Sequence, residues 1–185
     1  NRDNIETRPI KGTRPRSANH SDDAHYRADL QQSQKERAEL AMITDLLRND
    51  LSVVSEVGSV HVISDREIIG LPNVWHSYSV IRSKLRSDFS ALDALRSMTP
   101  AGSVTGCPKS STVKLIRELE QYERGMYCGV LWCQVTQKEL YSSVAIRTVE
   151  YDDGKLSLGV GSGIVEASDP ASEYDETIEK AKLFL

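Results

Sequence analysis

Residues 126–160 read MYCGVLWCQVTQKELYSSVAIRTVEYDDGKLSLGV, and this stretch decides the fold class. Its β-branched, aromatic and other apolar residues predict three strands, over 126–135, 139–150 and 155–160. The links between them, Thr136-Gln137-Lys138 and Asp152-Asp153-Gly154, are short enough for hairpins. Consecutive hairpins predict an antiparallel meander, and a meander combined with helices is typical of an α+β domain.

Upstream of this stretch the pattern changes from turn-rich to helical. Residues 1–28 are polar and contain Pro and Gly, which argue against a continuous helix there. Leu40, Ile43 and Leu47 recur at steps of three and four, which predicts a helix over 29–50. Alternation in VGSVHVI predicts a short strand at 57–63.

Three further helices are expected. One covers 88–97, and a second covers 109–124 and is ended by Gly125. The last begins after Asp169, which can cap it, with Pro170 at the first helical position. On that helix the apolar residues form one stripe, at Tyr174, Ile178, Ala181 and Leu185.

Composition limits the classes of partner. The 185 residues carry 23 Lys and Arg against 27 Asp and Glu, a net charge of −4, which argues against nucleic acid or an anionic membrane. The sequence holds no apolar run near the ~18 residues that a membrane-spanning helix needs. Cys107, Cys128 and Cys133 form no CxxC pair, so we expect no disulfide framework or structural zinc site, and a reducing, cytoplasmic location. Because the chain starts at Asn1 without an initiator Met, we expect it to be part of a longer protein.

Two predicted helices each carry a Glu-x-x-Glu pair. Glu36 and Glu39 project onto the side that should face the core, where an unpaired carboxylate is costly. Glu173 and Glu176 form a stripe with Lys180 on the last helix. Carboxylates converging from two helices suit a hard cation such as Mg²⁺. The alternatives are a solvated face with a Glu176–Lys180 pair, and a first turn around Glu36 that protrudes beyond the core.

Other candidate residues lie in glycine-rich turns and in a strand. Residues 105–109 open a helix and 159–163 follow a strand, so both could approach an anion, although each pattern also suits a structural turn. Arg147 lies in a predicted strand, on the same face as Ala145, where a buried guanidinium needs a carboxylate. Lys11 lies in a predicted turn; such a lysine is normally solvated, but in a desolvated or cation-rich site it becomes a nucleophile.

Taken together, these segments resemble the chorismate-utilising enzymes, the family of anthranilate, aminodeoxychorismate, isochorismate and salicylate synthases. The matching stretches keep the family's order from Arg8 to Lys182: RPIKGTRPR, ERAELAMITDLLRND, HSYSVIRSKL, PAGSVTGCPKSSTVKLIRELE, RGMYCGVLWC, VAIRT and GSGIVEASDPASEYDET. The resemblance implies the anthranilate synthase component I-like fold, α+β with antiparallel sheets packed face to face and helices outside. It implies that residues 1–185 are the C-terminal portion of a single chorismate-binding catalytic domain.

The resemblance also implies roles for the candidate residues. Glu39 and Glu176 match the family's Mg²⁺ ligands. Glu36 and Glu173 match acids that either contact these ligands or reach the ion through a water molecule. Tyr127 and Arg147 match positions that bind the enolpyruvyl carboxylate, helped by backbone N–H groups near Gly161 and Gly163. The remaining matches are His76 near the leaving group of the ring, Lys180 near the metal, and Gly12 and Thr13 along the ring.

Lys11 distinguishes the branches of the family. Anthranilate synthases tend to carry Ala in this turn, whereas PIKGT resembles the aminodeoxychorismate synthases, a branch serving 4-aminobenzoate and folate synthesis. There the lysine adds to ring carbon 2 and ammonia from a glutamine amidotransferase subunit then enters at carbon 4. The alternatives are anthranilate synthase component I, more distantly an isochorismate or salicylate synthase, and a non-catalytic chorismate-binding fragment. Leu40-Ala41 and Ser162 depart from the family's usual residues, and neither is a proposed ligand.

Overall fold

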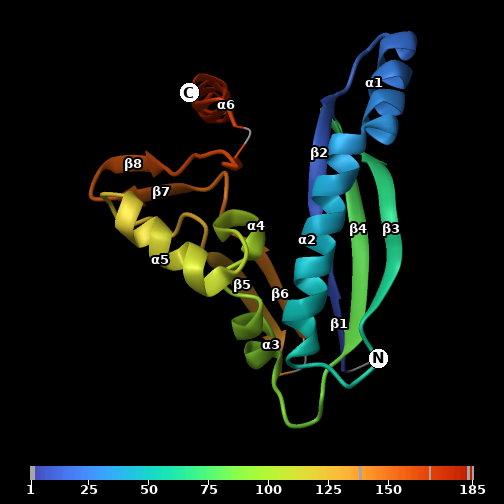
Figure 1. Ribbon diagram of the computed structural model, residues 1–185, viewed down its shortest axis with the longest axis vertical. Coiled ribbons are helices and arrows are strands. Elements are labelled where there is room, and N and C mark those ends of the chain that lie inside the picture. Colours follow the sequence, from blue (N-terminus) through green and yellow to red (C-terminus); the bar gives the residue numbers. More distant parts are fainter. Residues whose placement is uncertain (1–2, 138, 167, 183, 185) are drawn as a thin grey trace. The chain divides into compact units, whose positions relative to one another are not determined.

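The computed structural model describes residues 3–137, 139–166, 168–182 and 184, and this part of the chain forms two compact units. The first unit ends at Met98 and the second begins at Thr99 (Figure 1). In the described part of the chain, no helix has both the length and the apolar character needed to cross a bilayer.

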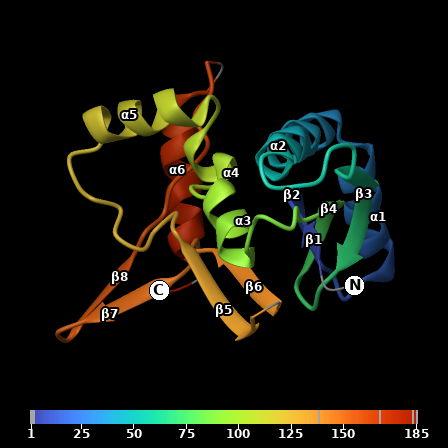
Figure 2. The same cartoon turned by 90° about the horizontal axis from the view of Figure 1, so that it is seen from below.

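The first unit is built on a four-stranded antiparallel sheet with β4 at its centre. β3 pairs with one edge of β4. β1 and β2 both pair with the opposite edge of β4, each with a different part of its length. Helix α2 lies over one face of this sheet (Figures 1 and 2). The elements of this unit are β1 (Asn4–Thr7), β2 (Ile10–Pro15), α1 (His20–Gln32), α2 (Gln34–Ser52), β3 (His61–Gly70), β4 (Val74–Lys84) and α3 (Ala91–Ser97).

The core of the first unit lies between α2 and β4. Leu40, Ile43 and Leu51 of α2 are buried, as is Ile81 of β4. Alternate β4 positions on this side are serines, whose small side chains let the helix approach closely. Their buried hydroxyls are satisfied, since those of Ser77 and Ser79 donate to backbone carbonyls of neighbouring strands.

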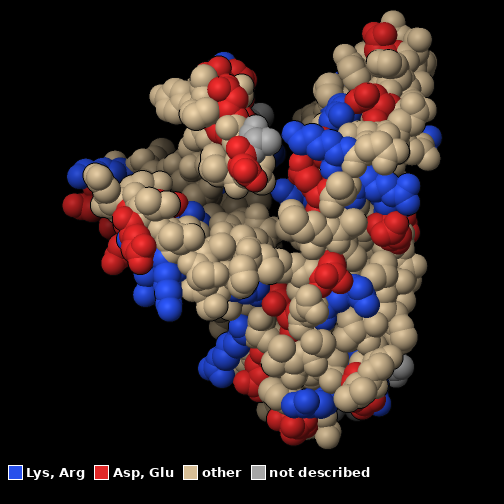
Figure 3. Space-filling view, in the orientation of Figure 1, with Lys and Arg blue, Asp and Glu red and all other residues tan. Residues whose placement is uncertain are grey.

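Ion pairs attach α1 to the rest of the first unit. Oδ1 of Asp23 accepts from Arg16 Nε at 2.8 Å, from the Ser17 backbone at 3.0 Å and from Trp75 Nε1 at 3.0 Å. The guanidinium of Arg16 also stacks on the Trp75 ring, 4.2 Å from its centroid. Figure 3 shows basic and acidic side chains interspersed over the surface of α1 and α2, as expected for helices held by such pairs.

Among its described residues, the second unit contains two separate antiparallel hairpins, β5 with β6 and β7 with β8, together with three helices. Asp153 and Gly154 both have positive φ, 43° and 77°, which suits the two-residue turn between β7 and β8. The elements of this unit are α4 (Gly102–Thr105), α5 (Lys109–Leu119), β5 (Val130–Thr136), β6 (Glu139–Val144), β7 (Val149–Asp152), β8 (Lys155–Leu158) and α6 (Pro170–Ala181).

Several predictions for the second unit are confirmed. The α+β class with antiparallel sheets is correct, as are both hairpin links, although Lys138 of the first link lies outside the described residues. Helix α6 starts as predicted, with the Asp169 side chain accepting from the Ser172 backbone. Its apolar stripe is largely exposed within the described chain, and Leu185 lies outside it.

The predicted meander is wrong. The strand expected over 139–150 stops at Val144, because the chain bends at Arg147, whose φ is +52°. β6 and β7 therefore belong to different two-stranded sheets. Helix α5 ends at Leu119, before the predicted end at 124, and β5 starts at Val130 after a turn.

The first unit also differs from the sequence prediction. Residues 1–28 contain two strands and the start of α1 at His20, not only turns. The helix predicted over 29–50 is divided at Ser33, which ends α1 and caps α2 by accepting from the Glu36 backbone. The strand expected at 57–63 is β3, from His61 to Gly70, and β4 was not predicted.

Candidate functional site

Lys11 lies in an irregular part of strand β2, where sequence analysis predicted a turn. The register of β2 against β4 shifts between Ile10 and Thr13, and Gly12 has a φ of +86°. The Lys11 carbonyl accepts from the buried Ser77 hydroxyl, which fixes the backbone at this point. Such a bulge redirects side chains, and bulges are frequent next to active sites.

Lys11 and Glu39 face each other across this bulge. Nζ of Lys11 lies 3.8 Å from Oε2 of Glu39, and each side chain is 35% exposed. The distance is longer than a hydrogen bond, so this is a loose ion pair in partial contact with water.

Glu36 is held much more firmly. Its Oε1 lies 3.3 Å from a terminal nitrogen of Arg14, whose Nε donates to Asp29 at 2.5 Å. The side chain is only 19% exposed, and a Cβ at Gly12 would lie 3.1 Å from its Oε2. The predicted location of Glu36 and Glu39 towards the core is thus partly correct: both are half-buried, and both have cationic partners.

Arg14 is a residue that sequence analysis missed. It joins both helices to β2 through Asp29 of α1 and Glu36 of α2, and these hydrogen bonds raise its pKa. The sequence carried no signal for this role, because residues 1–28 were predicted as turns and the bulge near Gly12 is a feature of the backbone.

His76 and Thr13 form a second contact between β4 and β2. They are directly paired in the sheet, with His76 Nδ1 3.0 Å from the Thr13 hydroxyl and 3.4 Å from the Gly12 carbonyl oxygen. His76 is therefore oriented by β2 and is half-buried. The first unit thus brings together Lys11, Gly12, Thr13, Glu36, Glu39 and His76.

In the second unit, Tyr127 packs against the glycine-rich segment. A Cβ at Gly159 would lie 2.3 Å from the ring, and one at Gly161 would lie 2.8 Å from the hydroxyl, so only glycines permit this approach. Burial and the neighbouring Cys128 raise the pKa of Tyr127 to about 12, and its hydroxyl therefore stays protonated at neutral pH.

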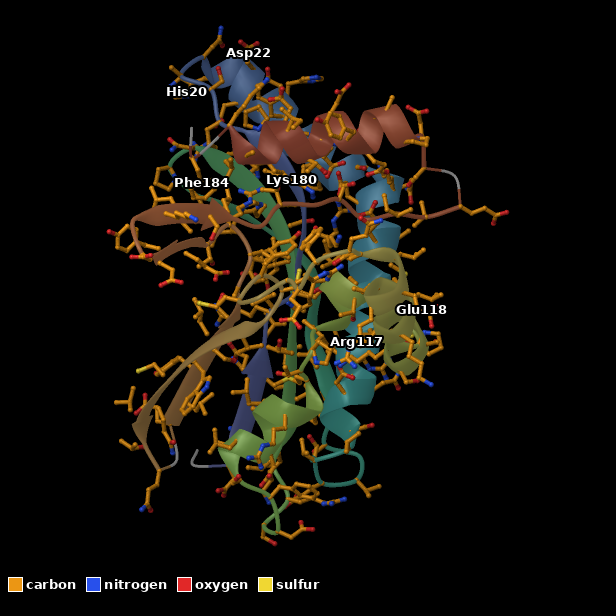
Figure 4. All side chains as sticks on the ribbon, turned by 90° about the vertical axis from the view of Figure 1, so that its left-hand side faces the viewer. His20, Asp22, Arg117, Glu118, Lys180 and Phe184 are labelled. Carbon is orange, nitrogen blue, oxygen red and sulfur yellow. The ribbon has the colours of Figure 1, made fainter. Side chains whose placement is uncertain are left out.

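Lys180 connects this segment to α6. Its Nζ donates to the Gly161 carbonyl at 3.0 Å and pairs with Glu176 at 2.7 Å; Figure 4 labels Lys180 on α6. Glu173, one turn earlier, accepts from the Ser168 hydroxyl at 2.7 Å. Beside it lies an open cavity of about 350 Å³, lined by Ser162, Ile164, Ser168, Pro170, Glu173, Tyr174 and Thr177.

Arg147 and Gly163 differ from the predicted arrangement. Arg147 is exposed in the bend between β6 and β7, so it is not the buried strand residue that alternation predicted. Ala145, its predicted neighbour on the same face, is buried. Gly163 is also exposed, beyond the part of the segment that Tyr127 covers.

The two Glu-x-x-Glu pairs offer carboxylate oxygens, which are the kind of donor that suits Mg²⁺. Mg²⁺ prefers oxygen and is commonly bound by one or two carboxylates together with water and an anionic substrate. Glu36 and Glu39 are three residues apart on α2, as are Glu173 and Glu176 on α6, which places each pair on one helix face. Among the described residues of either unit, no group of three His, Cys, Asp or Glu side chains is placed to bind one ion.

Comparison with known proteins gives consistent matches. The sequence model of a family described as chorismate binding enzyme matches residues 1–185. The chain is 43% identical over 180 residues to anthranilate synthase component 1 3 of Haloarcula marismortui, covering 97% of this chain and 36% of that protein. It is 41% identical over 181 residues to aminodeoxychorismate synthase component 1 of Klebsiella aerogenes, covering 98% of this chain and 40% of that protein.

A solved structure gives the same match at the level of the fold. Anthranilate synthase component I from Streptococcus pneumoniae superposes with a TM-score of 0.86 at 35% identity, over 97% of this chain and 39% of that chain. The chain therefore spans well under half the length of the relatives that it matches.

Proposed function

The chain belongs to the chorismate-binding enzymes, and we propose that it forms part of an aminodeoxychorismate synthase component 1. In this proposal, chorismate and ammonia give 4-amino-4-deoxychorismate and water, for the synthesis of 4-aminobenzoate and folate. A glutamine amidotransferase subunit supplies the ammonia. Because the chain spans 36% and 40% of the two relatives compared above, the activity is proposed for the whole protein that contains it.

The position of the Lys11 side chain is the observation that supports the aminodeoxychorismate synthase branch. Its side chain projects from the bulge of β2, is partly exposed, and has only a loose ion pair with Glu39. An amine in that position is available to a bound substrate, whereas a deeply paired lysine would not be.

The proposed reaction has two steps. The neutral Lys11 amine adds to ring carbon 2, both ring double bonds shift by one position towards carbon 4, and the 4-hydroxyl departs; the proton lost by nitrogen and the departing hydroxide make water. Ammonia then adds at carbon 4, both double bonds shift back, the bond between carbon 2 and the lysine nitrogen breaks, and one ammonia proton returns to Lys11. The enolpyruvyl group is retained throughout.

The other residues are assigned to binding and orientation. We place His76, oriented by Thr13, near the departing hydroxyl, and Gly12 along the ring. Tyr127 and Arg147, with the backbone of Gly161 and Gly163, are assigned to the enolpyruvyl carboxylate, and Lys180 to the neighbouring carboxylate. Glu39 and Glu176 are assigned to Mg²⁺, with Glu36 and Glu173 acting through water. When bound, Mg²⁺ supplies positive charge that holds the ring carboxylate and stabilises negative charge developing in the ring.

Product analysis tests this proposal. The purified protein is incubated with chorismate, Mg²⁺ and excess ammonium, and products are identified by liquid chromatography and mass spectrometry. We expect an amino product that retains its enolpyruvyl group. Lys11→Ala should abolish that product without changing the melting temperature, because the side chain is partly exposed and its ion pair is loose. Unchanged turnover in Lys11→Ala would exclude the covalent role.

Anthranilate synthase component 1 is the second candidate, since several relatives at 40–43% identity carry that name. Formation of anthranilate and pyruvate in the same incubation would establish it in place of the first. Chorismate binding without any product would instead favour a non-catalytic binding role.

A further inference from the structure

Backbone hydrogen bonds fix the chain of the second unit on both sides of Tyr127. The N–H of Tyr127 itself donates to the Arg124 carbonyl at 3.0 Å, which closes a turn beyond the end of α5. The N–H of Cys128 donates to the Ala145 carbonyl at 2.9 Å, and the N–H of Ala145 donates to the Gly129 carbonyl at 2.9 Å. The backbone therefore fixes the base of the Tyr127 side chain, whereas the position of its hydroxyl depends on what contacts the ring.

The side chain of Arg124 is held by three hydrogen bonds. Its Nε and one terminal nitrogen donate to the two carboxylate oxygens of Glu120, at 2.8 Å and 2.6 Å, so this ion pair is bidentate. The other terminal nitrogen donates to the Val104 carbonyl at 3.1 Å. The two charged side chains are only 22% and 27% exposed, and partial burial strengthens such a pair. Arg124 thus connects α4 with the end of α5.

The same guanidinium contacts the ring of Tyr127. Its central carbon lies 5.8 Å from the ring centroid, within the range of a cation–π interaction. The ring also packs against Gly159, and its hydroxyl lies beside Gly161, where an added Cβ would be only 2.8 Å away. The ring therefore has two supports, a guanidinium that is itself held in place and a segment that approaches closely because it lacks side chains.

We infer that Arg124 is a positioning residue, which holds the Tyr127 hydroxyl where it can donate to a carboxylate of the substrate. The inference rests on the proposed function, which assigns Tyr127 to the enolpyruvyl carboxylate. A hydrogen bond weakens steeply when its donor is displaced, so a small movement of the ring lowers substrate affinity. The guanidinium is already paired with Glu120, and its effect therefore reaches the substrate through Tyr127.

Substrate affinity measured without amination tests the inference. Binding of chorismate to the purified protein is followed by calorimetry, with saturating Mg²⁺ and no ammonium. Tyr127→Phe should weaken binding about tenfold, because it removes one hydrogen bond to a charged group. Arg124→Met should weaken binding about threefold to tenfold, because the hydroxyl is present but displaced. The double variant should bind no more weakly than Tyr127→Phe, since Arg124 then has no hydroxyl to position.

A spectroscopic signal from Tyr127 separates positioning from a general loss of charge. The protein, which contains seven tyrosines, is labelled with 3-fluorotyrosine, and the Tyr127 resonance is assigned by its absence in Tyr127→Phe. The shift of this fluorine resonance between H₂O and D₂O reports how exposed the ring is to solvent. We expect Arg124→Met to increase that shift, because the ring loses one of its two supports.

Two further variants control for folding and for charge. Glu120→Gln retains Arg124 but weakens the bidentate pair, so it should change affinity and solvent shift in the same direction by a smaller factor. Arg117→Met removes an exposed arginine from the last turn of α5, labelled in Figure 4, and should change neither quantity. Thermal denaturation verifies that each variant is folded.

The outcomes distinguish this inference from the proposed function. Weaker binding in Tyr127→Phe, combined with unchanged binding or an unchanged solvent shift in Arg124→Met, overturns the positioning and leaves the assignment of Tyr127 intact. A double variant that binds much more weakly than Tyr127→Phe also overturns the positioning. Unchanged binding in Tyr127→Phe, or no chorismate binding by the unmodified protein, overturns both. The expected losses, combined with anthranilate as the product, support the positioning and exclude the proposed branch.

Discussion

Gly12 combines a backbone constraint and a packing constraint at one residue. Its φ of +86° is costly for any residue with a side chain, and an added Cβ would lie 2.8 Å from Leu30 and 3.1 Å from Glu36. We expect Gly12→Ala to lower the free energy of unfolding by about 2–4 kcal/mol, measured by urea denaturation.

Gly58 provides the matched control for that substitution. Its φ is +77°, but no heavy atom lies within 4 Å of an added Cβ. Gly58→Ala should therefore cost about 1 kcal/mol, from backbone strain alone. Equal losses in the two variants would show that the contact with α1 and α2 contributes nothing.

The ionisable groups of the candidate site can be recognised in the sequence, but the environment of each group cannot. The pairing of Glu176 with Lys180 followed from helix periodicity, since the two are one turn apart. The role of Arg14 was missed, and Arg147 was wrongly assigned to a strand, because both depend on backbone geometry: a bulge near Gly12 and a bend at positive φ. Residue type does not reveal either feature.

At the scale of elements, Asp23 makes the attachment of α1 sensitive to acid. Its hydrogen bonds with Arg16, Ser17 and Trp75 lower its pKa to about 2, against ~3.9 for an unfolded chain. A lowered folded-state pKa contributes stability that is present above about pH 4 and lost as the pH falls towards 2. The difference in urea midpoint between the unmodified protein and Asp23→Asn should thus shrink over that interval.

Asp22→Asn is the control for this measurement, because Asp22 has the same charge and is the adjacent residue in the first turn of α1 (Figure 4). This variant removes a charge from the same turn and leaves the hydrogen bonds of Asp23 with Arg16, Ser17 and Trp75 in place. A midpoint difference for Asp23→Asn that does not depend on pH would contradict the interpretation.

Helices with a regular apolar spacing or a clear capping signal were predicted from the sequence, whereas the strand β4, which has serines at buried positions, was not. Leu40 and Ile43 identified α2, and Asp169 with Pro170 identified the start of α6. β4 was missed because its buried positions include Ser77 and Ser79, which resemble polar surface residues in sequence. Their burial is stable only because Lys11 and Asp65 of neighbouring strands supply carbonyl acceptors, which a single strand's sequence cannot show.

At the scale of the whole molecule, the two units should differ in local stability. The first has a four-stranded sheet with a buried central strand, whereas the second has two isolated hairpins with exposed side chains such as Trp132 and Leu156. Two-stranded sheets are marginally stable, so amides of β5 to β8 should exchange hydrogen faster than those of β4. Hydrogen exchange read by mass spectrometry tests this, and equal protection of both units would contradict it.

The central place of β4 also has a consequence for the order of assembly. β1 and β4 pair Asn4 with Lys84, so the sheet joins residues from opposite ends of the first unit. Pairings of such long sequence separation carry a large loop-closure entropy and fold slowly. During synthesis on the ribosome, β1 and β2 therefore wait with unpaired edges until β4 emerges, and that interval is when a chaperone would be most useful to this protein.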